Sequence, residues 1–312
     1  MRSTTVLVVL LFAWGQAQAQ QPTTAREYYE RGLKHETHKR YAEALADFSK
    51  AIELDPLFYD AYFSRSSIYD SHPEQDKRDY RKAVEDLSKM LEIAPRAFSP
   101  RFNRGMCYES LREYDKAIAD YTHILEKGAD FSRSGLSIEQ NQGRTYSQRA
   151  MTYDWYKGEY AKAVSDYTQA LKLYPDLDKD QNLYCWRGRA HHMLKDYVQA
   201  DADFKEAMKL TPTYSCLLCN YAWMLATCPD DKFRDGKKAV ELAEAGTLAI
   251  KNTAPEHLDV LAAAYAEVGR FPEAAVRQKE ALSHLNKRTE PMRKGMEARL
   301  KLYEAGKPYR TE

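Results

Sequence analysis

The sequence has no excess of either charge. Its 47 lysines and arginines stand against 46 aspartates and glutamates in 312 residues. If Arg2 is removed with an N-terminal leader, 46 residues of each sign remain. The two signs are mixed along the chain, whereas proteins that bind nucleic acid carry clustered lysine and arginine to neutralise phosphates. We therefore expect no nucleic-acid partner.

Cysteine is scarce and odd in number: Cys107, Cys185, Cys216, Cys219 and Cys228. An exported chain with five cysteines keeps at least one thiol unpaired, so we do not expect a disulfide-built fold. Cys216 and Cys219 have the C-x-x-C spacing at an expected helix start, where the helix dipole lowers a thiol pKa. The βαβ context of redox motifs is missing. We interpret both as packing residues and leave their oxidation state open.

Sequence motifs for catalysis and phosphate binding are also missing. The chain contains no Gly-rich phosphate loop, no G-x-S-x-G elbow and no H-E-x-x-H helix. His191 and His192 have no nucleophile and carboxylate at a recognisable spacing. We expect no catalytic residues, no metal site and no cofactor, and hence no enzymatic activity.

Long apolar runs are confined to the N-terminus. Val6–Trp14 follows the basic Arg2 and precedes Ala17 and Ala19, which have the spacing of a signal-peptidase site. The run is too short to act as a membrane-spanning stop-transfer helix. Residues 1–19 are therefore predicted to be a secretory signal peptide. We expect a mature chain without a membrane span, exported to the periplasm or the extracellular space.

One repeated pattern fills most of the remaining chain. In residues 181–212 a small residue, Gly188, lies in a first helical stretch, Tyr197 and Ala200 lie in a second, and Pro212 ends it. The first-helix small residue recurs as Gly32, Ser66, Gly105, Ala150, Gly188, Ala222 and Ala262. The second-helix alanine recurs as Ala44, Ala83, Ala117, Ala163, Ala200, Ala239 and Ala274. An aromatic residue precedes six of these alanines: Tyr41, Tyr80, Tyr114, Tyr160, Tyr197 and Phe271.

This pattern resembles the tetratricopeptide repeat (TPR), a helix–turn–helix unit of about 34 residues. The resemblance implies an all-α, right-handed superhelical solenoid of about seven repeats over residues 25–286. Thr289 and Pro291 are typical of a helix start, so residues 289–306 are predicted to form a capping helix, followed by a tail at 307–312. Residues 220–265 are similar to the closing repeats of secreted bacterial members of the family.

Three polar insertions lengthen the repeats. They lie at Asp70–Asp79, Gly128–Gly143 and Cys228–Gly236, and turn-rich insertions of this kind form surface loops. The interval 128–143 is either such a loop or a hinge between two halves of the array.

Two columns of the repeat vary together. The first five repeats carry an arginine before the first-helix small residue and an aspartate in the second helix, and repeats six and seven lose both. The arginines are Arg31, Arg65, Arg104, Arg149 and Arg187, and the aspartates are Asp47, Asp86, Asp120, Asp166 and Asp203. Since the two positions lie at similar heights in an antiparallel hairpin, we predict five two-pronged ion pairs. The alternative is an arginine ladder for an acidic ligand.

In the TPR family the first helices line a concave groove, which implies a protein or peptide partner. Carried onto this chain, the groove residues with the best case as partner contacts are Phe102, Asn103, Met106, Gln148, Trp155, Trp186, Arg189, His192, Asn220 and Trp223. Tyr29, Glu30, Phe63 and Cys219 belong to the same set. Tryptophan is enriched at binding hot spots, although these rings could instead only pack between adjacent helices.

Two functions remain open from the sequence. The first is a non-enzymatic scaffold or adaptor that holds a protein or peptide in the groove, with repeats four to six as the main contact. The second is a structural subunit of a cell-envelope assembly, such as a secretion or polysaccharide-export complex, that binds by its edges or its convex face.

Overall fold

The computed structural model describes residues 22–74, 76, 78–177, 182–249, 254–287 and 289–311. The expected signal peptide at 1–19 lies outside these residues. The chain divides by its internal contacts into two compact units, Met1–Ile93 (unit 1) and Ala94–Glu312 (unit 2). The described residues form helices and turns, with an isolated β-bridge between Ala97 and Asp130. The all-α prediction is confirmed. None of the described helices is both long and apolar enough to cross a bilayer.

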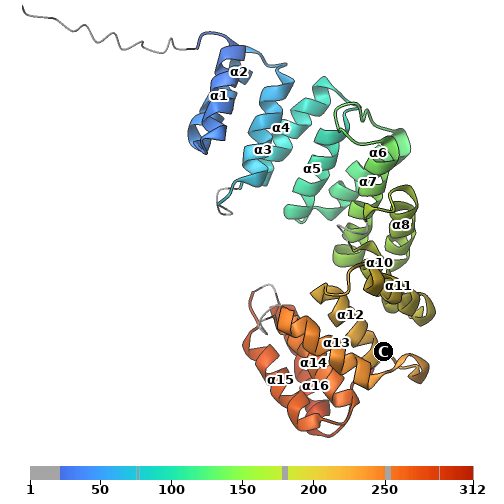
Figure 1. Ribbon diagram of the computed structural model, residues 1–312. Helices are drawn as coiled ribbons and strands as arrows, with labels where there is room; N and C mark the ends of the chain where they lie inside the picture. The colour runs from blue at the N-terminus through green and yellow to red at the C-terminus, as the bar shows by residue number, and fades with distance from the viewer. Residues whose placement is uncertain are drawn as a thin grey trace, which may run out of the picture. The chain divides into compact units, whose positions relative to one another are not determined.

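Unit 1 contains two helical hairpins (Figure 1). Helix α1 (Ala25–Thr37) pairs with α2 (Tyr41–Leu54), and α3 (Tyr59–Ser71) pairs with α4 (Tyr80–Ile93). Thr24 begins α1 because its hydroxyl accepts a hydrogen bond from the backbone amide of Glu27, and its own backbone amide donates to the Glu27 carboxylate.

The described residues of unit 2 form five hairpins of the same kind and a final helix (Figure 1). The first helices of its hairpins are α5 (Phe98–Ser110), α7 (Ile138–Thr152), α10 (Leu183–Met193), α12 (Ser215–Thr227) and α14 (Pro255–Glu267). The second helices are α6 (Tyr114–Lys127), α8 (Tyr160–Leu173), α11 (Tyr197–Leu210), α13 (Gly236–Ala249) and α15 (Phe271–Ser283). The final helix, α16 (Arg293–Glu304), packs on α15.

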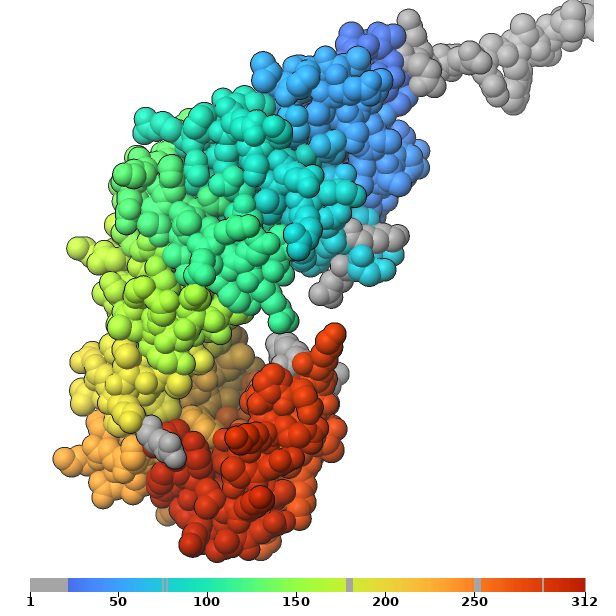
Figure 2. Space-filling model, turned by 180° about the vertical axis from the view of Figure 1, so that it is seen from behind, coloured from blue at the N-terminus to red at the C-terminus, as the bar shows by residue number. Residues whose placement is uncertain are grey.

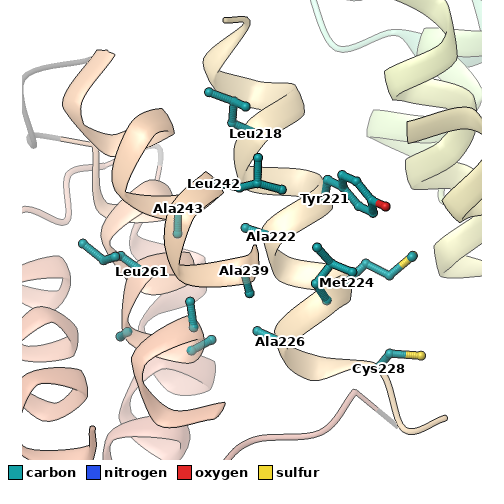
Figure 3. Close-up of a cluster of buried hydrophobic side chains, with 14 of the residues drawn as sticks. Leu218, Tyr221, Ala222, Met224, Ala226, Cys228, Ala239, Leu242, Ala243 and Leu261 are labelled. Carbon is teal, nitrogen blue, oxygen red and sulfur yellow. The ribbon is translucent and has the colours of Figure 1, made fainter. Parts of the chain in front are cut away.

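The two small-residue columns lie where paired helices meet. All seven second-helix alanines are fully buried, with 0% of their surface exposed. In Figure 3, Ala222 of α12 and Ala239 of α13 lie between the two helices, with Leu242 beside them. At Gly105 the approach is so close that a Cβ atom would lie 2.5 Å from the ring of Tyr121. Small side chains therefore set the helix spacing in each hairpin.

The aromatic column starts the second helices. Six of them begin at the predicted aromatic residue, and α13 begins at Gly236. Two residues earlier, five of the turns contain a residue in the left-handed conformation: Lys39, Arg112, Gly158, Lys195 and Gly269, with φ between 59° and 79°. This conformation reverses the chain between the helices, and only glycine adopts it without a steric cost.

The five predicted arginine–aspartate pairs are present. In each, the arginine Nε and Nη2 donate to the two carboxylate oxygens of the aspartate at 2.6–2.9 Å. In three of them the Nη1 group also donates to a hydroxyl on the preceding second helix: Arg65 to Ser49, Arg149 to Thr122 and Arg187 to Thr168. The arginines thus link each hairpin internally and link neighbouring repeats, so the structural interpretation is confirmed.

The insertions and the C-terminus have their own local structure. In the 128–143 interval, Ser137 caps α7, and the amide of Asn141 donates to the Ser134 hydroxyl at 2.6 Å. The hinge there stays a prediction. The expected capping helix begins at Arg293 because Pro291 lies in a short 3₁₀ turn, Glu290–Met292. It ends before Gly306, whose φ is 67°.

Candidate functional site

A cavity of about 410 Å³ lies in unit 2 where three successive first helices, the helices that the family resemblance assigns to the inner, concave face, meet the final helix. We call it the inner pocket; it is lined by Arg189, His192, Met193, Phe204, Asn220, Trp223, Glu256, Asp259, Val260, Met292 and Arg299. In Figure 2 the segments from α14 to α16, orange to red, form one packed block against the yellow and gold hairpins that precede them. Larger cavities lie at the 128–138 loop and beside α2, but neither is lined by a predicted groove residue, whereas the inner pocket is.

Four of the predicted groove residues come together in the inner pocket. Arg189 and His192 lie in α10, and Asn220 and Trp223 lie in α12. Their positions relative to the first-helix small residue are the ones that the family resemblance assigns to the groove. The Asn220 amide is 3.6 Å from the Cys185 sulfur. The Asn220 amide lies beside the apolar side chains of Met193 and Phe204, and in this setting it is able to hydrogen-bond the backbone of an extended peptide.

The final helix forms one wall of the pocket through a buried ion pair. Arg299 donates to both carboxylate oxygens of Asp259 at 2.9 and 2.7 Å, and the Gln278 amide donates to the same carboxylate at 2.8 Å. Burial raises the pKa of Asp259 even though the guanidinium of Arg299 and these hydrogen bonds favour its charged form. The Arg299 guanidinium also lies 5.3 Å from the Trp223 ring centroid. Arg299 therefore both holds the indole ring of Trp223 in place and closes one side of the pocket.

The α10 side of the pocket carries His192, which is neutral, and Arg189, whose charge is balanced by a carboxylate. Burial, reinforced by the nearby charge of Arg189, lowers the pKa of His192 to about 4. Arg189 donates to the buried carboxylate of Asp154. Burial raises the pKa of Asp154, opposed by the attraction of Arg189. The pocket thus presents an uncharged imidazole at neutral pH.

Two of the predicted tryptophans pack against each other, one exposed and the other partly buried. Trp155 and Trp186 are edge-to-face with ring centroids 5.0 Å apart, and Tyr214 continues the row at 6.2 Å from Trp186. Trp155 is 41% exposed. It lies in a π-helical turn, Tyr153–Lys157, at the end of α7. Such turns accommodate one extra residue in a helix and are frequent at functional sites.

The extra residue of this π turn can be read in the repeat spacing. Ala150 and Ala163 are 13 positions apart, whereas the corresponding pairs Gly105–Ala117 and Gly188–Ala200 are 12 apart. Since the turn between the helices keeps the same left-handed residue before α8, the added residue is absorbed by the π turn. It places Trp155 against Trp186 and Asp154 against Arg189.

The third tryptophan is not part of this pair. Trp223 contacts the ring of Tyr309 at a centroid distance of 5.8 Å, and Arg299 lies beside both rings. Residues of the chain's own C-terminal end thus cover part of Trp223. That all three indoles line one groove stays a prediction.

The remaining predicted residues of unit 2 lie on α5 and α7. Phe102 is buried against Phe98 and Tyr121, and Gln148 donates to the Glu109 carboxylate at 2.7 Å. Met106 is 41% exposed and Asn103 is partly buried. The Gln148 side chain is thus engaged within the protein. Met106 is the most accessible of the four.

In unit 1, Tyr29 packs between Phe48 and Phe58, and Glu30 pairs with Arg26 at 2.7 Å. Phe63 is 41% exposed.

Sequence reasoning missed a column of acidic residues four places after the first-helix small residue: Glu36, Asp70, Glu109 and Asp154. Burial raises the pKa of each. In the next repeat the column holds His192. Comparison of the internal copies would have revealed this column. Arg299 and Tyr309 lie outside the repeats, so no comparison of copies would have identified them.

The cysteines are packing residues in the structure. All five are free thiols, and Cys216 is the only one not fully buried. Burial raises the pKa of Cys219, which disfavours the reactive thiolate. Its sulfur lies at Gly246, where a Cβ would approach it to 2.8 Å. Within the described part of the chain, no group of three or more His, Cys, Asp or Glu side chains is placed to hold a metal ion.

Solved structures share this fold at low sequence identity. A TPR protein from Parabacteroides merdae ATCC 43184 is 15% identical, with a TM-score of 0.58 over 88% of this chain and 98% of that one. MamA is 18% identical, with a TM-score of 0.50 over 61% and 92%. YrrB, described as a TPR protein with an unusual peptide-binding site, is 18% identical with a TM-score of 0.50 over 62% and 90%.

A search of curated proteins finds no match. Models of the family described as tetratricopeptide repeat match residues 25–58, 74–130, 143–177 and 181–214. These ranges contain the α1–α2, α5–α6 and α10–α11 hairpins and most of α7–α8, together with four of the five arginine–aspartate pairs, and the chain belongs to the tetratricopeptide repeat family.

Proposed function

We propose that the protein is a non-enzymatic scaffold or adaptor that holds a protein or peptide partner on the inner face of unit 2. The partner contacts the inner pocket and the Trp155–Trp186 pair. The observation that carries the proposal is the convergence of Arg189, His192, Asn220 and Trp223 from two successive repeats on one cavity of about 410 Å³.

The chemistry of the surface supports a peptide ligand. Aromatic rings at Trp155 and Trp186 supply large apolar contact area, and the Asn220 amide supplies directed hydrogen bonds. The charges of Arg189 and Arg299 are balanced by Asp154 and Asp259. A ligand is therefore recognised by its apolar side chains and its backbone more than by a high charge. YrrB, which has the same fold, is described as having a peptide-binding site.

We also propose that the mature protein acts outside the cytoplasm, in the periplasm or the extracellular space. The support is the sequence pattern of residues 1–19 alone. Fractionation of cells that express the full chain tests it, and a mature N-terminus that still contains Val6–Trp14 would contradict it.

The second candidate is a structural subunit of an envelope assembly that binds through its outer surface. One observation favours it: the second helices expose single apolar side chains, with Val198, Leu248 and Val276 each more than 60% exposed. Scattered apolar residues are common on protein surfaces, so we rank this candidate second.

Partner capture from an envelope extract of the source cells distinguishes the two. The immobilised mature chain is compared with an inner-face variant (Trp155→Ala, Asn220→Ala) and an outer-face variant (Val198→Ala, Leu248→Ala). Scaffold function predicts that the inner-face variant loses the partner and the outer-face variant keeps it. The reverse result would support the envelope-assembly subunit, and circular dichroism of both variants controls for folding.

A further inference from the structure

Residues 307–311 lie against the C-terminal end of α12. After α16 the backbone reverses at Gly306, and the Thr311 amide and hydroxyl donate to the Thr227 carbonyl at 3.0 and 3.2 Å. The Arg310 guanidinium donates to the Ala226 carbonyl at 3.3 Å. The last carbonyls of a helix have no partner within it. Here a separate segment, residues 307–311, supplies the donors.

Two side chains of this segment have specific partners. The Tyr309 ring packs on Trp223, and the Arg299 guanidinium lies 5.3 Å from both ring centroids. Arg310 forms an ion pair with Glu267 of α14 at 2.6 Å, and the Glu267 side chain is only 12% exposed. We call the surface formed by Trp223, Thr227, Glu267 and Arg299 the tail site.

We propose that the tail site recognises an extended segment in which an aromatic residue is followed by a basic one, and that the chain's own Tyr309–Thr311 occupies it until a partner segment of that kind displaces it. This inference rests on the proposed function and names the chemistry of the partner. The native occupant shows which groups the site accepts: a ring on Trp223, a cation on Glu267 and backbone donors on the end of α12.

The geometry makes the resident segment replaceable. Residues 307–311 are not helical, and Tyr309 to Thr311 are held by the packing of the Tyr309 ring on Trp223 and Arg299, by one ion pair and by a few hydrogen bonds. A cavity of about 200 Å³ lined by His192, Tyr197, Trp223, Tyr309 and Thr311, among others, lies beside the segment and adjoins the inner pocket. An incoming peptide can therefore begin in the inner pocket and replace the tail from its edge.

A binding titration with the full mature chain tests the proposal. The probe is a fluorescein-labelled peptide Lys-Pro-Tyr-Arg-Thr, which copies residues 307–311, and binding is followed by fluorescence anisotropy. The released-tail variant, Tyr309→Ala with Arg310→Ala, is expected to bind the probe. The wild type is expected to bind about tenfold more weakly, because the occupied fraction of a site lowers its apparent affinity.

Three controls define the result. Arg293→Ala, which alters an exposed arginine of α16, should behave as the wild type. Adding Glu267→Gln to the released-tail variant should weaken binding of the probe, and a probe with alanine in place of tyrosine should not bind. If Tyr309→Ala impairs folding, Arg310→Glu serves as a second releasing variant. It replaces the ion pair with Glu267 by a repulsion between two carboxylates and does not change the Tyr309 side chain.

The outcomes separate this proposal from the proposed function. Equal binding of the probe to wild type and released-tail variant, or no binding to either, would overturn the tail-site proposal. If partner capture still depended on Asn220, the scaffold function would stand without it. Wild-type dimers that Tyr309→Ala dissolves would show that the tail docks on a second copy, which would also overturn the proposal as stated.

Discussion

At the scale of single residues, His192 gives the protein a specific sensitivity to acid. Its pKa is lowered from 6.5 to about 4 by burial and by Arg189. The unfolded chain therefore binds a proton between these values while the folded chain does not, and stability rises with pH across that window. The stability that the neutral imidazole contributes is complete above pH 6.5 and is lost as the pH falls toward 4.

The first prediction follows from this rise of stability with pH. Replacing His192→Gln should reduce the loss of unfolding free energy between pH 7 and pH 4 by about 3 kcal/mol, from 1.36 kcal/mol per pKa unit. Urea unfolding at several pH values, compared with the exposed-site control His284→Gln, measures it. Glu109 and Asp154, whose pKa values are raised by burial, act in the opposite direction in all three proteins. Identical pH profiles for His192→Gln and the wild type would contradict the prediction.

A second prediction concerns the closest helix contact. In Gly105→Ala the added Cβ would lie 2.5 Å from the Tyr121 ring, and the shift this forces in a packed core costs about 1–3 kcal/mol. Gly295→Ala is the matched control, since its Cβ would come no closer than 3.4 Å to Arg299, which is an ordinary van der Waals contact. Thermal unfolding should separate the two variants. Equal melting temperatures would mean that the α5–α6 hairpin tolerates a wider spacing than its packing indicates.

The ion pairs give a third prediction. Arg187 and Asp203 are 18% and 8% exposed, so Arg187→Ala leaves a largely buried carboxylate without its partner and should cost about 2–3 kcal/mol, somewhat below a fully buried pair. Replacing both, Arg187→Met with Asp203→Leu, should recover most of the loss. Urea midpoints measure this. An unchanged midpoint in Arg187→Ala would revive the alternative of an arginine ladder that serves an acidic ligand.

At the scale of helices and turns, the hairpin reversals carry a measurable cost. Lys195 occupies the left-handed conformation with φ of 62°, where Gly158 and Gly269 stand in two other repeats. Lys195→Gly should stabilise the protein by about 0.5–1 kcal/mol by removing the steric penalty, and Gly158→Ala should destabilise it by a similar amount. Differential scanning calorimetry of both variants checks this. Destabilisation by Lys195→Gly would show that the side chain makes contacts that outweigh the backbone cost.

The sequence predicted the hairpins well because each feature occurs several times. The two small-residue columns predicted the paired helices, and the covarying arginine and aspartate columns predicted the five ion pairs. The π turn was missed although its signal is one extra residue between Ala150 and Ala163. The reason is physical: a single inserted residue can enlarge the loop or distort the helix, and spacing alone does not choose between them.

Prediction of the site was less complete. Arg189, His192, Asn220 and Trp223 were predicted and line one pocket. Arg299 and Tyr309 were not predicted as site residues, since each occurs once and reaches the pocket through tertiary packing of α16 and the residues that follow it. A residue type that recurs at the same position of several repeats can be recognised from the sequence. The contacts of Arg299 and Tyr309 occur once and depend on how α16 packs against the repeats.

At the scale of the whole molecule, the account assigns different tasks to the two helices of each repeat in unit 2. The second helices carry the buried alanines and aspartates that hold the hairpins together. The first helices α10, α12 and α14 carry most of the inner pocket, Phe204 of α11 adds to its lining, and α16 closes it. Stability and recognition are therefore separable, which is why the inner-face and outer-face variants can be compared without unfolding the array.

The most direct test is hydrogen–deuterium exchange of the mature chain with and without its captured partner. Binding on the inner face predicts slower exchange in α10, α12 and the ends of α14 and α16, with α11, α13 and α15 unchanged. Protection confined to α11, α13 and α15 would contradict the account, because it would place the partner on the outer helices.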